Sequence, residues 1–415
     1  MSRNRFISAI DLGSSHIRVM ISELAQDGED TLRIIGVGEA PSFGMRKGIV
    51  SDGESLAKSV SEAIEKAESM AGVSLRDAIV SIGGTNVRTQ EGKGVIAVAK
   101  ADGEVTHDDI DRVLKSAGKV DIPLNYEIIH IIPRSYRLDD QKDIQDPVGM
   151  QGVRLEVDTL IVVGFSPQIK QIQNVMSSCG VNILQFVFTP LASAQAILDR
   201  EQKELGVAVI DLGAMTTGLA VYEEGELLYC SSLNIGASSI TSDIAIGLRT
   251  SISLAERVKV EYGTANLSSI DRSEEIQLDA LDPSEEGDVS RYHVGEIIEA
   301  RLEEILEKMQ KELTSIDRDH LLPAGIILCG GGANIPEIID LTKRSLALPV
   351  SLGYPRSLSG IVDKVDDPSY AVVAGLIRWQ WEHENEGGTG SFFQGNPLFR
   401  TIVEKFREWF QTFLP

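Results

Sequence analysis

The sequence predicts an α/β fold of two duplicated domains around a cleft, with an inserted α+β subdomain and a C-terminal amphipathic helix. Three observations lead to this prediction. Strand-like runs alternate with helical periodicity from about residue 6 to about residue 381, which is typical of covered mixed sheets. Two stretches some 200 residues apart resemble each other, which indicates a duplication. Residues 85–163 differ in pattern and interrupt the first repeat.

The repeat consists of two similar strand pairs. Residues 9–24 (AIDLGSSHIRVMISEL) and residues 209–225 (VIDLGAMTTGLAVYEEG) each contain an apolar strand, Asp-Leu-Gly, a small polar turn and a second apolar strand. After the first pair, residues 53–72 place Leu56, Val60 and Ile64 at helical spacing, which predicts an amphipathic helix. The two halves are therefore expected to share one architecture.

The inserted segment has its own set of elements. It begins with a hairpin pattern, followed by a helix that Thr106 is expected to cap, with acidic residues in the first turn. Two strands, residues 127–138 and 154–165, follow the helix. A small α+β subdomain over residues 85–163 is expected.

The first strand pair has the composition of a phosphate-binding turn. Gly13 permits close approach of the backbone, and Ser14 and Ser15 add hydroxyl donors. Asp11, at the end of the strand, is placed to hold a magnesium-bound water, and Arg18 to reach phosphates from the returning strand.

The second strand pair offers the same groups through Asp211, Gly213, Thr216 and Thr217. Either turn alone is more often an ordinary tight turn. Two of them facing each other would clamp the phosphates of a nucleotide, with Mg²⁺ held through water between Asp11 and Asp211.

A third motif follows the second repeat. In GIILCGGGANIPEI an apolar strand leads to Gly330, Gly331 and Gly332, and a helix is expected to begin at Asn334, with Pro336 in its first turn. Consecutive glycines before a helix allow a ribose or adenine to approach the backbone closely.

These motifs, in this order, resemble the actin-like ATPase superfamily. The resemblance implies ATP with Mg²⁺ in a cleft between two duplicated domains. The segment AERVKVEYG looks like the helix that contacts the nucleoside in several members, which implies roles for Glu256 and Lys259. A plain surface ion pair at i,i+3 remains the alternative for these two residues.

Within the superfamily, the chain resembles the FtsA family of bacterial cell-division proteins. The most specific stretch is IIHIIPRSYRLDDQKDIQDPVGMQGVRLEVDTLIV in the inserted segment, and PSFGMRKGIVSD and TSDIAIGLRTSISLAERVKVEYG are also similar. The implied subdomains are a first actin-like one (1–84, 164–203, 366–381), the insertion (85–163), a second actin-like one (204–242, 318–365), an upper one (243–317), a linker (382–397) and a membrane-targeting helix (398–415).

Catalytic positions depart from those of chaperone-type relatives. Thr189 stands where a carboxylate helps to position water, Ala214 and Met215 replace a usual Gly-Gly, and Gly218 replaces a later acidic residue. A threonine cannot accept a proton near neutral pH, and loss of a general base costs roughly 10² to 10⁴ in rate. ATP binding with weak or absent hydrolysis is expected, and Met215 could also weaken binding.

The last residues form one continuous apolar stripe at spacings of three and four, with charged residues opposite and Asn396 suited to cap the helix. Membrane targeting is expected, since an aromatic stripe with basic neighbours suits an anionic membrane interface. A partner groove or docking on the protein's own core are the alternatives. The stripe residues are Leu398, Phe399, Ile402, Val403, Phe406, Trp409, Phe410 and Phe413.

The partners follow from charge and from the resemblance. A formal net charge of -23 argues against nucleic acid, whose binding needs basic surface. The FtsA resemblance implies binding of the C-terminal peptide of FtsZ on residues 243–317, self-assembly into filaments, anionic inner-membrane lipids and other division proteins. It also implies a peripheral position on the cytoplasmic face of the membrane at the division site.

Other functions remain open at this point. A sugar-kinase-like phosphotransferase would need a carboxylate base beside a hydroxyl substrate, and the sequence shows no such residue beyond the aspartates of the phosphate turns. A chaperone-like ATPase would need a substrate domain, but only some 35 residues follow Trp381. A pilus-assembly actin homologue is a closer alternative, which the DPVGMQGVRLE segment disfavours.

Overall fold

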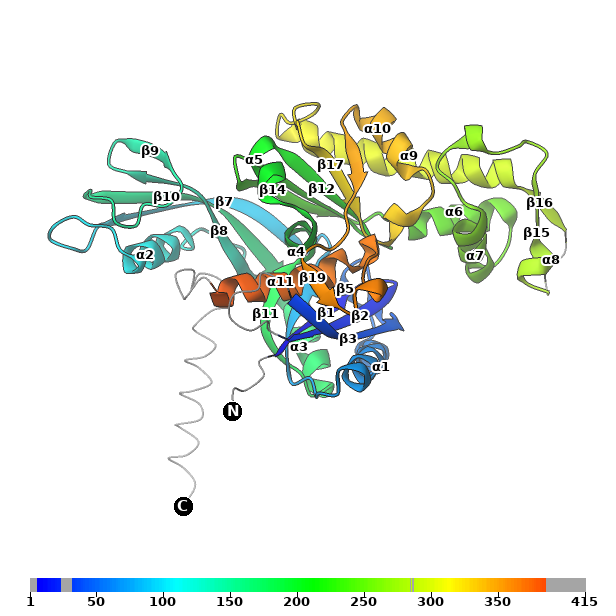
Figure 1. Cartoon of the computed structure of the whole chain (residues 1–415), viewed down its shortest axis with the longest axis horizontal. Coiled ribbons are helices and arrows are strands. Elements are labelled where there is room, and N and C mark those ends of the chain that lie inside the picture. The colour runs from blue at the N-terminus through cyan, green and yellow to red at the C-terminus, as the bar shows by residue number, and fades with distance from the viewer. Residues whose placement is uncertain (1–5, 24–31, 284, 286, 386–415) are drawn as a thin grey trace, which may run out of the picture.

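The protein is seen here in a computed structural model that describes residues 6–23, 32–283, 285 and 287–385. Two mixed sheets form the centre of an elongated molecule. The inserted subdomain extends from one end and a mainly helical arm from the other (Figure 1). The α/β prediction is confirmed.

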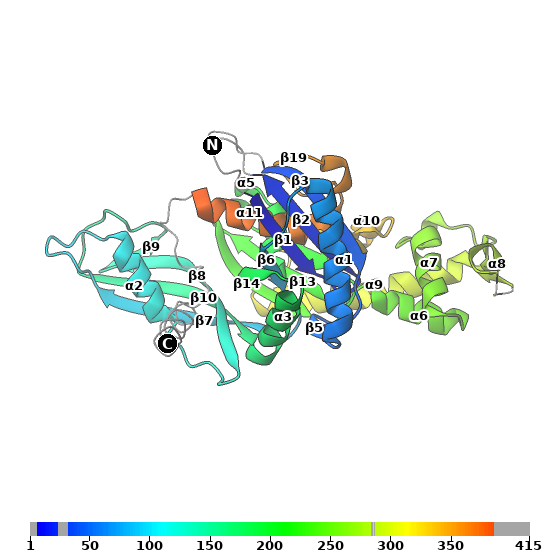
Figure 2. The ribbon, with the colours of Figure 1, turned by 90° about the horizontal axis from the view of Figure 1, so that it is seen from below.

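The first sheet has the strand order β11-β6-β1-β2-β3-β19. β1, β2 and β3 are antiparallel neighbours, and β6 pairs parallel to β1. Helices α1 (Gly53–Ala71) and α3 (Ser166–Ser178) lie on one face and α11 (Ala371–Asn385) on the other (Figure 2). The strands are β1 (Phe6–Leu12), β2 (His16–Glu23), β3 (Leu32–Pro41), β6 (Asp77–Ile82), β11 (Asn182–Phe188) and β19 (Leu358–Gly360).

The second sheet has the order β14-β13-β12-β17-β18, which repeats the order β3-β2-β1-β6-β11 of the first. Strand directions repeat as well, since β12, β13 and β14 are antiparallel neighbours and β17 runs parallel to β12. The predicted duplication is therefore confirmed. The strands are β12 (Val207–Leu212), β13 (Thr217–Glu223), β14 (Glu226–Leu233), β17 (Gly325–Cys329) and β18 (Val350–Leu352).

The inserted subdomain is a four-stranded sheet, β7-β10-β8-β9, covered by one helix with a small core of its own. Thr106 caps the helix in a reciprocal capping box with Asp109, whose carboxylate accepts the N–H of Thr106 at 3.0 Å. This matches the predicted cap. The elements are β7 (Val87–Ala97), α2 (His107–Ala117), β8 (Tyr126–Leu138), β9 (Gln141–Ile144) and β10 (Arg154–Phe165).

The insertion docks on the edge strand of the second sheet. The guanidinium of Arg134 donates to the backbone carbonyls of Leu227, at 3.2 Å, and Leu228. The Thr89 hydroxyl donates to the carbonyl of Cys230 at 3.1 Å. Side chains from the insertion thus satisfy backbone acceptors on the free edge of β14.

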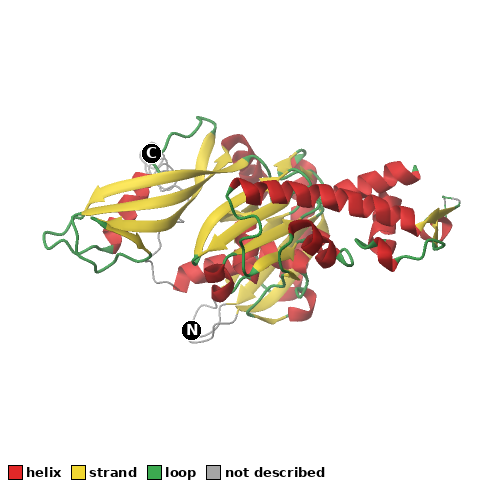
Figure 3. Cartoon of the chain, turned by 90° about the horizontal axis from the view of Figure 1, so that it is seen from above, coloured by secondary structure: helices red, strands yellow, loops and turns green. Residues whose placement is uncertain are grey.

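The helical arm is built around α9, which runs from the body of the molecule to the tip of the arm (Figure 3). A short hairpin, β15 with β16, closes the tip. The elements are α6 (Ser238–Leu248), α7 (Ile252–Tyr262), η1 (Leu267–Ser269), β15 (Glu275–Gln277), α8 (Leu278–Leu281), β16 (Asp288–Ser290) and α9 (Arg291–Ser315).

Local residue chemistry explains the bounds of α1. The Asp52 carboxylate accepts the N–H groups of Glu54, at 3.1 Å, and Ser55. The helix ends at Gly72, whose φ of 69° is left-handed.

The remaining short elements are β4 (Met45–Arg46), β5 (Ile49–Val50), α4 (Thr189–Ile197), α5 (Arg200–Leu205), η2 (Gly331–Asn334), α10 (Ile338–Leu346), η3 (Val362–Lys364) and η4 (Pro368–Tyr370).

Three expected boundaries were wrong. Gly331–Asn334 forms a 3₁₀ turn and α10 begins only at Ile338, because Glu337 adopts a left-handed conformation that interrupts the helix. Leu358–Gly360 pairs with β3, so part of residues 318–365 belongs to the first sheet. Residues 382–385, expected in the linker, continue α11, where Glu382 pairs with Arg378 at 2.9 Å.

The expected membrane-targeting helix, residues 398–415, lies outside the described residues, as does the rest of the linker. Within the part of the chain that the structure describes, no helix has the length and apolar character needed to cross a bilayer.

Candidate functional site

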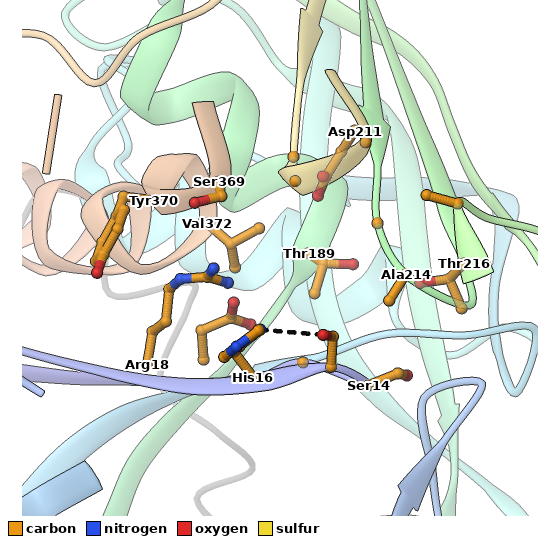
Figure 4. Close-up of a pocket in the computed structure, with 18 of the residues that line it drawn as sticks. Ser14, His16, Arg18, Thr189, Asp211, Ala214, Thr216, Ser369, Tyr370 and Val372 are labelled. Carbon is orange, nitrogen blue, oxygen red and sulfur yellow. Dashed lines mark hydrogen bonds between the residues drawn. The ribbon is translucent and has the colours of Figure 1, made fainter. Parts of the chain in front are cut away.

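A cavity of about 770 Å³ opens between the two central sheets. Both Asp-Leu-Gly turns and the glycine-rich turn border it. In Figure 4, Ser14 of the first turn lies below Ala214 and Thr216 of the second. Every predicted cofactor residue except Thr217 lines the cavity. The lining set includes Asp11, Gly13, Ser14, Ser15, Arg18, Asp211, Gly213, Thr216, Glu256, Lys259, Gly330, Gly331, Gly332 and Asn334.

Thr217 has a different environment. Its hydroxyl is buried and donates to the carbonyl of Ile235 at 2.7 Å. The side chain therefore fixes the start of β13 against the following segment instead of facing the cavity.

The two turns need glycine for the same reason. A Cβ on Gly13 would lie 2.5 Å from the carbonyl oxygen of His16, and one on Gly213 would lie 2.9 Å from that of Thr216. The chain folds back too tightly for a side chain at either position. Both turns consequently present bare backbone to the cavity.

Asp11 and Asp211 are the next-to-last residues of β1 and β12, the first strands of the two repeats. The Ser81 hydroxyl donates to Asp11 at 2.8 Å, and the N–H of Leu12 donates to the same hydroxyl oxygen at 2.8 Å. Burial raises the pKa of Asp11, although Arg18 and Ser81 oppose the rise. Burial, and then the charge of Asp11, raise the pKa of Asp211 to about 7.

Two buried carboxylates with raised pKa values, one of them raised in part by the charge of the other, fit a hydrated divalent cation, whose charge would favour the ionised forms. Among the described residues no cluster of three or more metal-ligating side chains occurs. A Mg²⁺ ion here would therefore take most of its ligands from water and phosphate, as Mg²⁺ commonly does.

The glycine-rich turn contacts the second aspartate. Gly330 has a φ of +81°, and a Cβ there would lie 2.4 Å from a carboxylate oxygen of Asp211. At Gly331 the nearest atom would be the Cβ of Ser369, 3.9 Å away. Gly330 is thus required by the fold, whereas Gly331 leaves open space on the cavity side.

Asn334 was expected to face the ligand from a helix start. Its side-chain amide instead donates to both carboxylate oxygens of Asp367 at 3.1 Å. Asp367 also accepts the N–H of Ser369 at 2.8 Å. This network joins the glycine-rich turn to the segment that leads into α11.

Arg18 lines the cavity but is held by other side chains. Its guanidinium pairs with Glu39 at 2.9 Å and lies 5.0 Å from the ring centre of Tyr370 (Figure 4). The Tyr370 hydroxyl donates to Glu39 at 3.2 Å. The motifs did not predict Glu39, although the register of β2 with β3 places it directly opposite Arg18.

Glu256 and Lys259 both line the cavity and pair with each other. The Lys259 ammonium donates to Glu256 at 2.7 Å and to the hydroxyl of Thr241 at 2.9 Å. Lys259 is only 9% exposed. The i,i+3 pair therefore exists at the cavity wall, where Lys259 is buried and Glu256 is about half exposed.

Two further residues complete the wall near the first turn. Thr189, the first residue of α4, lies against Gly83, where a Cβ would be 2.9 Å from its hydroxyl oxygen. His16 was missed by the sequence analysis, although it directly follows the polar turn. Its Nδ1 is 3.0 Å from the Ser15 hydroxyl (Figure 4). Burial and the Arg18 charge lower the pKa of His16, against the opposing effects of Glu39 and Glu256.

Comparisons with solved structures show the fold. The chain superposes with a TM-score of 0.65 at 15% identity on a structure described as the PilM–PilN type IV pilus biogenesis complex, covering 89% of this chain and 97% of the other. It superposes with a TM-score of 0.54 at 13% identity on ADP-bound MreB5 of Spiroplasma citri, with 92% and 99% covered. The fold is actin-like.

Comparisons of sequence show the family. The model for cell division protein FtsA matches residues 208–375, and the model for the SHS2 domain inserted in FtsA matches residues 84–163. The chain is 31% identical to cell division protein FtsA of Pseudomonas aeruginosa, over 98% of both chains. It is 34% identical to that of Neisseria meningitidis, over 90% of both.

A third relative, cell division protein FtsA of Bacillus subtilis, is 34% identical over 91% of this chain and 84% of its own length. These relatives favour the division assignment over a phosphotransferase or a pilus-assembly protein. The inserted subdomain, the duplicated sheets and the near full-length similarity lead to one conclusion: the chain belongs to the FtsA family of cell division proteins.

Proposed function

We propose that this protein binds Mg²⁺–ATP in the cavity between its two sheets, and that binding favours self-assembly on the inner membrane at the division site. The observation that carries the proposal is the convergence of both Asp-Leu-Gly turns and the glycine-rich turn on a single cavity. Those three turns come from segments more than 100 residues apart in sequence.

The proposed phosphate site lies between the two aspartate turns. Backbone N–H groups of the two turns other than that of Gly213, which donates to the carbonyl of Thr216 at 3.0 Å, would contact the phosphate oxygens together with the hydroxyls of Ser14, Ser15 and Thr216. Asp11 and Asp211 would hold Mg²⁺ through water, and the ion would supply charge neutralisation for the phosphates. The nucleoside would lie toward Gly331, Gly332 and Asn334, near Glu256 and Lys259.

Hydrolysis is expected to be slow or absent. The side chain that begins α4 at the cavity wall is Thr189, whose hydroxyl can bind water but cannot accept its proton near neutral pH. Nucleotide binding, and not turnover, is therefore the proposed control on assembly.

The proposed partner of the helical arm is the C-terminal peptide of FtsZ. The exposed large apolar side chains of the arm include Ile246 of α6, which is 76% exposed, and Ile252 of α7, which is 59% exposed. Arg249 lies in the turn between the two helices. An apolar surface beside a basic residue suits a peptide that contains both apolar and acidic groups.

Membrane attachment is assigned to residues 398–415. One amphipathic helix of this length binds an interface reversibly, whereas several on one filament bind firmly through effective concentration. Attachment would then depend on assembly, and assembly on the nucleotide.

The anchor is tested by pelleting with anionic vesicles. The full chain is compared with a chain that ends at Gly395, at equal concentration and without added partner. The full chain is expected to pellet with the vesicles and the shortened chain to stay in the supernatant. Equal behaviour of the two chains would exclude the anchor.

A further inference from the structure

We propose that His16 contacts the phosphates of the bound nucleotide and takes up a proton as the nucleotide binds, so that affinity rises as the pH falls. The inference deepens the proposed function and rests on it, because His16 belongs to the same cavity. It identifies a contact residue that the motif pattern did not predict.

The position of His16 is the first observation. It is the first residue of β2 and directly follows the turn of Gly13, Ser14 and Ser15. Its ring lines the cavity between Arg18 and Ser14 (Figure 4). A group that binds the hydroxyls and backbone of this turn would therefore lie beside the imidazole.

The second observation is that the other cations of the cavity wall are engaged or exposed. Arg18 pairs through its terminal nitrogen with Glu39 at 2.9 Å, although its buried Nε has no hydrogen-bond partner, and Lys259 pairs with Glu256 at 2.7 Å. Lys364 is exposed and has Asp363 beside it in sequence. Of the described basic residues that line the cavity, His16 remains as the one next to the phosphate turn.

The cavity as a whole is acidic, which makes a further positive charge useful to a polyanionic ligand. Carboxylates outnumber permanent cations among the lining residues. A polyphosphate entering this site therefore gains from a positive charge in addition to Arg18, Lys259, Lys364 and the proposed Mg²⁺ ion. The lining carboxylates are Asp11, Glu39, Asp211, Glu256, Asp363, Asp366 and Asp367.

The charges around His16 set the direction of its titration. Burial, followed by Arg18 on the same strand, lowers the pKa of the imidazole, while Glu39 of β3 and Glu256 of α7 raise it by less. The ring is therefore mainly neutral at neutral pH in the empty cavity. Further titratable groups that line the same cavity are Asp11 of β1, Asp211 of β12 and Tyr370, which precedes α11.

Binding reverses this balance. Phosphate oxygens beside the ring favour the charged imidazolium, so the pKa of His16 is higher in the complex than in the free protein. The complex then holds more protons than the free protein. Affinity rises as the pH falls from the pKa of the complex to that of the free protein, by about tenfold for each unit between them.

The test measures nucleotide affinity and proton uptake with the full chain. ADP is titrated by calorimetry at about pH 6 and about pH 8, with chelator to keep Mg²⁺ away from Asp211, and in buffers of different ionisation enthalpy. The wild type is expected to bind roughly tenfold more tightly at the lower pH and to take up protons. His16→Gln should lose the part of this dependence that the imidazole contributes and keep the part that comes from Asp211 and the nucleotide phosphate, and His16→Lys should show the same residual dependence as His16→Gln.

The terminal phosphate of ADP titrates near pH 6 itself, so the readout is the difference between wild type and His16→Gln. A second measurement, the imidazole proton resonance of His16 with and without ADP, needs no variant and should show a raised pKa in the complex.

Equal pH dependence in wild type and His16→Gln, with no shift of the resonance, would overturn the role of His16 and leave the nucleotide site intact. Failure of the wild type to bind ADP or ATP at any pH would overturn both.

Discussion

Gly330 and Gly331 are neighbours in one turn but differ in what a side chain would meet. A Cβ on Gly330 would lie 2.4 Å from Asp211, at a φ of +81°, whereas Gly331 has only the Cβ of Ser369 at 3.9 Å. We predict that Gly330→Ala destabilises the fold by about 1–3 kcal/mol. Gly331→Ala should fold normally but weaken nucleotide affinity, because its methyl group occupies cavity space.

Chemical unfolding and nucleotide titration of the two variants separate these effects. Equal stability loss in both would show that the difference in backbone geometry is unimportant. An unchanged nucleotide affinity of Gly331→Ala would show that the nucleotide does not contact this turn.

Asp211 makes stability depend on pH. Its pKa of about 7 is raised above the unfolded value, so the native state binds the proton more tightly and stability falls as the pH rises from about 4 to about 7. We predict that Asp211→Asn stabilises the nucleotide-free protein by up to a few kcal/mol near pH 8, and by less near pH 5. The exposed Asp121→Asn is the control, and thermal unfolding is the measurement. If the stabilisation by Asp211→Asn does not increase with pH, the raised pKa of Asp211 is contradicted.

The motifs predicted backbone features of the site better than side-chain contacts. Asp11, Gly13 and Gly213 follow from a repeated turn that is local in sequence. Glu39 and Tyr370, which hold Arg18, depend on strand register and on a segment some 350 residues away. Such contacts are set by tertiary structure, which the spacing of a single motif does not encode.

The contribution of one helix cap to stability can be tested at the N-terminus of α2. Asp109 is fully buried and accepts hydrogen bonds from the N–H of Ala99 and the N–H of Thr106, both at 3.0 Å. We predict that Asp109→Ala destabilises the protein by about 2 kcal/mol, because buried donors lose their acceptor. Asp108→Ala, at an exposed position of the same turn, should cost far less. Similar urea midpoints for the two variants would contradict this role.

The helical arm is tested with the FtsZ peptide. We predict that Ile252→Asp weakens binding of a labelled FtsZ C-terminal peptide at least tenfold, because it places a charge on the proposed apolar contact. Val153→Asp is the matched control, since Val153 is 72% exposed on the inserted subdomain. Fluorescence anisotropy gives the affinities. If both substitutions weaken binding equally, or neither does, the peptide does not bind at this surface.

Element bounds followed from sequence where caps are local. Asp52 and Gly72 delimit α1 as residue chemistry predicts. The start of α10 did not follow, because a left-handed Glu337 cannot be recognised from residue type. The extension of α11 beyond Trp381 did not follow either. Glu382 pairs there with Arg378 and with Gln195 of α4, and the second contact is set by tertiary structure.

At the scale of the whole molecule, the cavity lies between two sheets of the same strand order, and the insertion bridges them. It is rooted beside the first sheet and bonded through Arg134 to β14 of the second. A nucleotide that contacts both aspartate turns would draw the sheets together. The relative orientation of insertion and helical arm, which extend from opposite ends, would then be fixed for assembly.

The dependence of vesicle pelleting on Mg²⁺–ATP tests this coupling most directly. The full chain and Gly331→Ala are each pelleted with anionic vesicles over a series of Mg²⁺–ATP concentrations. The pelleted fraction of the full chain is expected to rise over the range in which ATP binds, and Gly331→Ala should need more ATP for the same fraction. Pelleting that is independent of ATP in both proteins would contradict control of membrane attachment by the cavity.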